Sequence, residues 1–219
     1  MMDEQTGTLW SHVTGEAMDG DLAGNYLEDF PVVQTTWSWW KEKFPETLVL
    51  KKDEEVKSSR YERYFTDPDR AGMFTVEWLE ARMPAKTKVH GITRGPFALA
   101  ITDEKLAPGA VFNAEVGEDP VVMLRSGDGG VRAYVARAGD TQLTFAARFT
   151  ETIAAGQSAD EAKRELTGIG DRETGSTWDM DRGLCVSGEL EGAQLEEVVT
   201  LLAFWFAWSN FYPKTDIID

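Results

Sequence analysis

The sequence is poor in the side chains from which redox centres and transition-metal sites are built. Its 219 residues include one cysteine, Cys185, and two histidines, His12 and His90. One cysteine cannot form a disulfide within its own chain, and a structural zinc site needs four cysteine or histidine ligands. Acidic residues are frequent, but no calcium-binding loop of the EF-hand type is present. We therefore predict no metal site and no cofactor.

Basic side chains and long apolar runs are also scarce. The chain has 22 lysine and arginine residues against 38 aspartate and glutamate residues, which gives a formal net charge of −16. Nucleic-acid binding requires clustered basic side chains, and anionic membrane surfaces repel an acidic protein. The longest apolar stretch, near residues 198–208, is shorter than the roughly 20 residues that cross a bilayer. We expect no nucleic-acid partner and no membrane insertion of this chain.

The residues that are present provide a core and an uneven distribution of charge. Hydrophobic residues make up 42% of the chain, and its length fits one domain. Residues 3–50 and residues 171–219 each have a net charge of −7, whereas the middle of the chain is nearly neutral. Two similar ends around a balanced centre suggest an internal repeat.

The repeat is found when residues 3–50 are aligned with residues 171–218 at a constant offset of 168. Without a gap, 14 of the 48 aligned positions are identical, including four glycine pairs and three tryptophan pairs. The identical pairs are Asp3/Asp171, Thr6/Thr174, Gly7/Gly175, Trp10/Trp178, Gly15/Gly183, Gly20/Gly188, Leu22/Leu190, Gly24/Gly192, Leu27/Leu195, Glu28/Glu196, Trp37/Trp205, Trp40/Trp208, Pro45/Pro213 and Thr47/Thr215. We interpret the match as an internal duplication on either side of a strand-rich middle, residues 51–170.

Each repeat predicts the same succession of elements. An Asp-x-x-Thr-Gly turn precedes a short tryptophan-bearing strand, a tight hairpin over the glycine-punctuated residues 15–24 or 183–192, and a helix near residues 35–44 or 203–211 that ends before proline. Thr35 or Thr36 is the expected N-cap of the first helix. Two tryptophans three residues apart share one face of each helix, and we expect them to pack the helix on a sheet.

The middle of the chain predicts mainly strands. A pair is expected at 88–92 and 97–101, an antiparallel meander at 120–126, 131–137 and 143–149, and helices at 75–83 and 158–166. Residues 104–113 are expected to form a loop. The predicted fold class is α+β. It is a single domain of internally duplicated antiparallel sheet units, each with a tryptophan-rich helix, in a pseudo-twofold arrangement.

Several long motifs match one family. They are DEQTGTLWSHVTGEA at 3–17, TTWSWWKEKFPET at 35–47, PAKTKVHGI at 84–92, FNAEVGEDPVV at 112–122, DRETGSTW at 171–178 and FWFAWSNFYPKT at 204–215. In these motifs the chain resembles the domain of unknown function 3179 family of bacteria and archaea, over nearly its whole length. The resemblance implies a periplasmic, cell-envelope or extracellular location, and it supplies no activity.

Relatives in this family commonly carry a further segment ahead of the first Asp-x-x-Thr-Gly motif, often with a secretion signal. Here Met1 lies almost inside that motif, and no signal peptide is recognisable. The second repeat follows the predicted strands at 120–149, and the first repeat has no counterpart to them. We therefore expect the N-terminus of this chain to be truncated.

The candidate ligand-binding residues lie on the two predicted hairpins. Trp10 and Trp178 stand beside polar residues, as a stacking platform for a ligand would, and Asp179 is one of several carboxylates at the second hairpin. His12 shares a strand face with Trp10 and is not duplicated, so it is either a ligand-binding group or general base, or a surface histidine. The same alternatives apply to His90.

Three functional hypotheses follow. The first is a non-catalytic envelope or extracellular protein that binds a small molecule or protein in a cleft between the repeats. It is favoured because no Gly-x-Ser-x-Gly or His-Glu-x-x-His motif is present. The second is a hydrolase-type enzyme with its site at the repeat junction. The third is a structural or assembly module.

Overall fold

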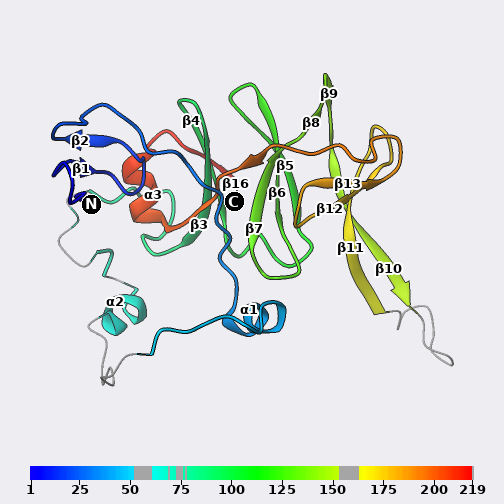
Figure 1. Cartoon of the computed structure of the whole chain (residues 1–219), viewed down its shortest axis with the longest axis horizontal. Coiled ribbons are helices and arrows are strands. Elements are labelled where there is room, and N and C mark those ends of the chain that lie inside the picture. Colours follow the sequence, from blue (N-terminus) through cyan, green and yellow to red (C-terminus); the bar gives the residue numbers. More distant parts are fainter. Residues whose placement is uncertain (52–60, 69, 73–75, 77, 153–162, 219) are drawn as a thin grey trace.

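In a computed structural model of the chain, β-sheet dominates and helices are few and short (Figure 1). The structure describes residues 1–51, 61–68, 70–72, 76, 78–152 and 163–218. Three four-stranded sheets are arranged along the long axis of the molecule, and a helix covers the outer face of one of the two outer sheets (Figure 1).

The central sheet is buried on both faces. Its order is β14-β7-β6-β5, from Glu197–Val198, Val131–Val135, Asp119–Arg125 and Val111–Val116, and all neighbours are antiparallel. Because side chains alternate along a strand, Val121 and Met123 pack in one core cluster while Val122 and Leu124 pack in another. The continuous apolar run of β6 is typical of a strand covered on both sides.

A second sheet packs on one face of the central sheet. Its order is β15-β3-β4-β16, from Leu201–Phe204, Lys88–Arg94, Phe97–Thr102 and Asp216–Ile218, with a parallel pairing only between β16 and β4. Helix α3, Trp205–Phe211, covers its outer face. Trp205 and Trp208 are fully buried there against Val89, Ala98 and Ala100.

A third sheet packs on the other face of the central sheet. Its order is β10-β11-β12-β13, from Phe145–Thr152, Lys163–Asp171, Thr177–Asp179 and Leu184–Ser187. Phe145, Ile169 and Trp178 from this sheet share a core cluster with Val122 and Tyr134 of the central sheet.

The remaining elements are small. They are the two-stranded pairs β1 (Leu9–Trp10) with β2 (Ala17–Asp19) and β8 (Arg137–Ala138) with β9 (Thr141–Gln142), and the helices α1 (Trp37–Lys43) and α2 (Glu62–Thr66). As expected, Thr36 caps α1, since its side chain accepts a hydrogen bond from the backbone N–H of Trp39 at 3.3 Å.

The turns that open the two matched segments carry the same hydrogen bonds. The indole Nε1 of Trp10 donates to Oδ2 of Asp3 at 2.9 Å, and Nε1 of Trp178 donates to Oδ2 of Asp171 at the same distance. Each aspartate also accepts from a threonine hydroxyl three residues on. The same local sequence therefore makes the same turn beside a two-stranded pair and within a four-stranded sheet.

The threonine and the glycine of each turn have structural roles. The hydroxyl of Thr174 donates to the aspartate of its own turn at 2.9 Å, and that of Thr6 does so at 2.7 Å. The glycine that follows has a left-handed backbone in both matched segments, with φ 71° at Gly175 and φ 70° at Gly7. As predicted, these residues form a turn, and both threonine hydroxyls are used in hydrogen bonds within it.

The hairpin predicted over residues 183–192 is divided into two turns. Strands β12 and β13 are joined at residues 180–183, so the hairpin ends at Gly183, whereas Gly188 and Gly192 lie beyond β13 in a second turn. That turn folds back on the strand, because the backbone N–H of Gly192 donates to the carbonyl oxygen of Cys185 at 2.9 Å. A Cβ at Gly188 would lie 2.7 Å from Cα of Ser176, so the close approach of two backbones requires glycine here.

The first matched segment is likewise divided into two turns. Gly20 and Gly24 follow β2 instead of lying within its hairpin, and the backbone N–H of Gly24 donates to the carbonyl oxygen of Ala17 at 2.9 Å. A Cβ at Gly20 would lie 2.8 Å from Cα of Thr8. Glycine spacing alone did not separate the hairpin turn from the turn that follows it.

The predicted elements differ from the structure in several other places. Residues 78–83 are not helical, because Arg82 extends to donate to the carbonyl oxygens of Pro213 and Thr215. Residues 163–166 belong to strand β11 rather than to a helix, and the rest of that prediction lies outside the described residues. Strand β10 pairs with β11 instead of extending the meander, and β5 occupies part of the predicted loop.

The tryptophan prediction is confirmed for one helix and wrong for the other. Trp205 and Trp208 pack α3 on its sheet, whereas Trp37 and Trp40 of α1 are 51% and 39% exposed. No buried residue is found in α1. The physical reason is that no sheet in the described part of the chain lies against α1.

A substitution of Gly91 on β3 tests how closely α3 packs on this strand. A Cβ atom at this position would overlap the ring of Trp208. We expect Gly91→Val to lower the free energy of unfolding by about 1–3 kcal/mol, the usual cost of overpacking a core, in urea denaturation. Gly127→Ala is the control, since a Cβ there meets no atom within 4 Å, and an equal effect of both variants would contradict this account.

Candidate functional site

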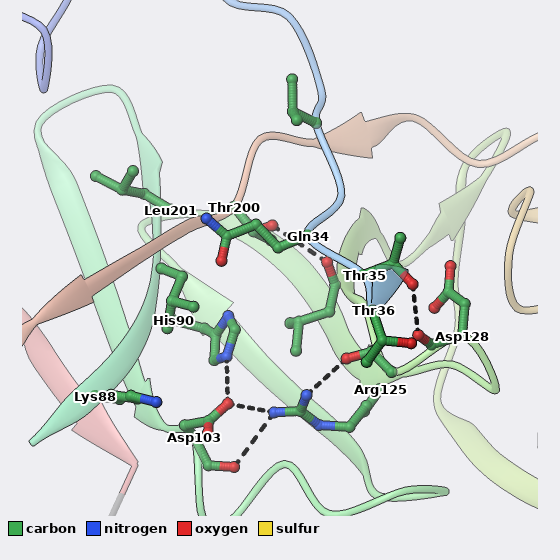
Figure 2. A pocket seen from close by; sticks show the side chains of 14 residues that line it. Gln34, Thr35, Thr36, Lys88, His90, Asp103, Arg125, Asp128, Thr200 and Leu201 are labelled. Atoms are coloured by element: carbon green, nitrogen blue, oxygen red, sulfur yellow. Dashed lines mark hydrogen bonds and ion pairs between the residues drawn. The ribbon is translucent and has the colours of Figure 1, made fainter. Parts of the chain in front are cut away.

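A cavity of about 420 Å³ lies where the first acidic segment, the middle of the chain and the second acidic segment meet (Figure 2). Residues 32–36 border it from the first segment, and residues 200–202 border it from the second. The middle contributes the polar side chains Lys88, His90 and Asp103, together with Arg125 and the turn between β6 and β7.

Strand β3 places two polar side chains in this cavity because its residues alternate. Lys88 and His90 lie on the cavity face, while Val89 and Gly91 lie on the opposite face under α3. His90 is only 6% exposed. Pairing of β3 with both β15 and β4 fixes this register, since His90 stands opposite Leu202 on one side and Ile101 on the other.

His90, Asp103 and Arg125 form a connected group. The ring nitrogen Nε2 of His90 lies 2.8 Å from Oδ1 of Asp103, and Nη2 of Arg125 donates to the same oxygen. Arg125 also donates to the backbone carbonyl oxygens of Leu106 and Gly129. Its guanidinium group is therefore fully engaged in the structure, and it orients Asp103 rather than remaining available to a ligand.

The pKa values in this group favour a neutral histidine and an ionised aspartate. Burial lowers the pKa of His90 and outweighs its hydrogen bond to Asp103 and the charge of that carboxylate, which raise the pKa. Burial raises the pKa of Asp103, but hydrogen bonds from His90 and Arg125 outweigh it and hold the pKa below its ordinary value. With Asp103 accepting at Nε2–H, the other ring nitrogen, Nδ1, is left with a free lone pair.

The far wall of the cavity is held by a buried ion pair. Nη2 of Arg132 lies 2.7 Å from Oδ2 of Asp128, which also accepts from the hydroxyl of Ser126 and the backbone N–H of Gly130 through Oδ1. Burial raises the pKa of Asp128, yet these hydrogen bonds lower it to about 2. The carboxylate is fully ionised and paired, so its role is to fix the turn between β6 and β7.

Three polar groups at the cavity remain free among the described residues. Lys88, the amide of Gln34 and Nδ1 of His90 have no hydrogen bond or ion pair within the described ranges of the chain. Figure 2 shows the Gln34 side chain above the His90 ring and the Lys88 ammonium group directed toward Asp103. The threonine hydroxyls are engaged, since Thr35 donates to the carbonyl oxygen of Asp128 and Thr200 to that of Val131.

The four residues favoured from sequence lie elsewhere. Trp10 and His12 are at the first hairpin, and Trp178 and Asp179 are on β12, at the opposite end of the long axis (Figure 1). Trp178 is fully buried and His12 is exposed. Asp179 accepts backbone hydrogen bonds from residues 181 and 182. The structure does not bring the two pairs together, and none of the four borders the cavity.

The residues that define the repeat signature also lie outside the cavity. They form turns, close backbone approaches and helix packing, so the positions that the two matched segments share shape the chain and do not line the site. The signature residues that do not border the cavity are Asp3, Thr6, Gly7, Gly20, Gly24, Trp37, Trp40, Pro45, Asp171, Thr174, Gly175, Gly188, Gly192, Trp205, Trp208 and Pro213.

His90 was a candidate from the sequence, but the sequence did not indicate which residues would contact it. Asp103, Arg125 and Gln34 come from three other segments, and no short motif links them. One local signal was available: Lys88 and His90 stand two apart on a predicted strand of an otherwise apolar run, so they share a face. Two polar side chains on a buried strand face indicate a cavity or a hydrogen-bonded group.

Within the described residues, no three histidine, cysteine or carboxylate side chains are grouped as a metal site would require. No helix there is long and apolar enough to cross a bilayer. A family model described as a protein of unknown function, DUF3179, matches residues 1–215. No curated protein and no solved structure matches the chain.

The lowered pKa of His90 predicts a pH-dependent stability. Because the folded state disfavours the protonated ring, the unfolded state binds more protons as the pH falls below the ordinary value of 6.5. We expect the free energy of unfolding to decrease from about pH 7.5 to about pH 5, measured by urea denaturation, and His90→Gln to remove part of that decrease.

The only other histidine, His12, is exposed and provides the control. If His12→Gln changes the pH dependence as much as His90→Gln does, the buried ring is not its source.

Proposed function

The chain belongs to the DUF3179 family of proteins of unknown function, and from its cavity we propose that it binds a small organic anion that carries a hydroxyl or amide group. The observation that supports this most is the free ammonium group of Lys88, which borders a cavity whose other charged side chains are already paired.

The size of the cavity suits a small metabolite. Ligand pockets commonly enclose about 300–1,000 Å³, and this one is near the lower end at about 420 Å³. Val32, Val131 and Leu201 provide apolar walls beside the polar groups. This mixture of apolar wall and few polar groups is typical of sites that orient one small molecule.

The charge of the cavity selects an anion. Asp103 is neutralised by Arg125, and Asp128 by Arg132, so Lys88 adds one uncompensated positive charge. This charge favours an anion in the cavity although the net charge of the whole protein is −16. A carboxylate accepts from the ammonium group, and the Gln34 amide supplies further donors.

The free lone pair on Nδ1 of His90 selects a second feature of the ligand. A neutral imidazole nitrogen accepts a hydrogen bond, so a hydroxyl or N–H group of the ligand is its complement. A small hydroxy acid or an N-acyl amino acid has both features, an anionic end and a neutral hydrogen-bond donor.

The position of the cavity relates binding to the repeats. We regard the two matched segments as copies produced by internal duplication and arranged with pseudo-twofold symmetry, and the supporting observation is the shared turn around Asp3 and Asp171. The cavity is then the junction that both copies close. Following the family resemblance, we assign this binding function to the cell envelope or the cell exterior.

Thermal-shift measurements with hydroxy acids, N-acyl amino acids and uncharged sugars test the proposal. A ligand that binds only the folded state raises the melting temperature, and we expect the anionic ligands to do so and the sugars not to. Lys88→Ala should abolish the shift because it removes the free charge, while Lys105→Ala, on the exposed turn after β4, should preserve it. An equal shift in both variants would place the anion elsewhere.

A hydrolase-type activity is the second candidate, and the His90–Asp103 pair favours it. A neutral imidazole that an ionised carboxylate orients is the arrangement of a general base. Nδ1 would take a proton from water as the water attacks the ester carbonyl carbon of the bound anion, and would return it to the alcohol oxygen as the ester C–O bond breaks and the alcohol leaves. Thr35 and Thr200 already donate their hydroxyl groups to carbonyl oxygens, so water is the nucleophile of choice.

Release of alcohol from esters of small hydroxy acids measures this activity. We expect His90→Gln to lower the rate by about 10²–10⁴-fold, the usual contribution of a general base. If His12→Gln loses the activity instead, the general base lies at the first hairpin. If neither the wild type nor the variant releases alcohol, the hydrolase hypothesis is wrong and ligand binding is the remaining proposal.

A further inference from the structure

Helix α1 and the chain that follows it fold in the same way as α3 and its continuation. The residue after each helix, Phe44 or Tyr212, has nearly the same backbone angles, φ −127° and ψ 69° against φ −126° and ψ 66°. Its ring lies 4.5 Å from that of Trp40 in one case and 4.3 Å from that of Trp208 in the other, both at an interplanar angle of 39°.

The same internal hydrogen bond closes both units. Nε1 of Trp40 donates to Oγ1 of Thr47 at 2.8 Å, and Nε1 of Trp208 donates to Oγ1 of Thr215 at 3.1 Å. We call residues 36–50 the first tryptophan unit and residues 204–218 the second. Residues 36–47 of the first unit thus have the same internal contacts as their counterparts, although no sheet in the described part of the chain covers them.

The two units differ in what lies against them. Trp205 and Trp208 are 0% and 1% exposed, while Trp37 and Trp40 are 51% and 39% exposed. The chain after the second helix forms strand β16 and pairs with β4. Its counterpart exposes Leu48, Val49 and Leu50 by 95%, 67% and 86%, although these side chains are apolar.

The second unit shows which kind of structure packs against a tryptophan unit. It packs on the β3–β4 hairpin, with the Trp208 ring directly on the backbone of Gly91, where any side chain would collide with it. Strand β16 then extends the hairpin at β4, with Asp216 opposite Leu99 and Ile218 opposite Ile101. The seat is therefore an antiparallel hairpin with a glycine under the tryptophan and an apolar edge strand.

We propose that the first tryptophan unit is a docking surface for a β-hairpin of a partner protein. That hairpin presents a glycine to Trp40, and its edge strand pairs with residues 48–50. Main-chain pairing at an open edge supplies affinity, and the indole seat supplies specificity. This inference does not depend on the ligand proposed for the cavity.

One difference between the units adds a requirement on the partner. Lys41 occupies the position of Ser209, which is fully buried against the sheet in the second unit. A lysine at a covered position keeps its charge only when it is paired. The partner hairpin therefore carries a carboxylate that faces Lys41. The β3–β4 hairpin needs no such carboxylate, because Ser209 is uncharged.

A cyclic peptide of residues 87–102 of this chain is the probe, because its sequence forms the hairpin that the second unit covers and contains no aspartate or glutamate. Its hairpin structure is verified by circular dichroism before titration. It is added to the full-length chain while the indole N–H signals of Trp37 and Trp40 are followed by NMR. We expect saturable shifts of both signals, and at least roughly tenfold weaker binding of the same peptide with Gly91→Val.

Variants of the chain identify the surface. Trp40→Ser should abolish binding, and Trp78→Ser should not, although Trp78 is 48% exposed and is therefore a matched control. Lys41→Ser should tighten binding, since the probe lacks a carboxylate for the ammonium group. Equal affinity of the two peptides, binding retained by Trp40→Ser, or no shift at about 1 mM peptide would overturn the docking proposal. Unchanged affinity of Lys41→Ser would overturn the required carboxylate.

Discussion

The contact between the ring of Trp208 and the bare backbone of Gly91 is the constraint on which the rest of the structure depends. It lets α3 lie directly on β3, so that one face of this strand is sealed by an aromatic ring. Alternation then directs Lys88 and His90 to the other face, where the cavity is found. Successive residues of β3 thus contribute to an apolar interface with α3 on one face and to the polar cavity on the other.

The polar site is kept in place by groups that do not themselves face a ligand. Arg125 connects Asp103 to the carbonyl oxygens of residues 106 and 129, and Arg132 holds Asp128 in the next turn. Because a buried charge is costly unless it is paired and hydrogen-bonded, each of these carboxylates is fixed by several donors at once. The groups that stay free among the described residues, on Gln34, Lys88 and His90, then stand in a rigid frame.

Features encoded over short distances were predictable from the sequence, and features assembled from distant segments were not. The Thr36 cap and the Asp-x-x-Thr-Gly turn involve neighbours within about seven residues, and both are found in the structure. The helix predicted over 75–83 is not found in residues 78–83, where Arg82 donates to carbonyl oxygens more than 130 residues away. The site escaped prediction for the same reason, since Gln34 lies in the loop before α1, His90 on β3 and Arg125 on β6, and these segments meet only in the folded chain.

The hydrogen bond from Trp40 to Thr47 has a consequence for the kinetics and entropy of association. It fixes the indole ring and the direction of the following chain before any partner arrives. A surface that is ordered in advance loses little conformational entropy when it is covered, so more of the contact energy remains as affinity. A short helix tied to a turn by one side-chain hydrogen bond thus acts as a rigid template.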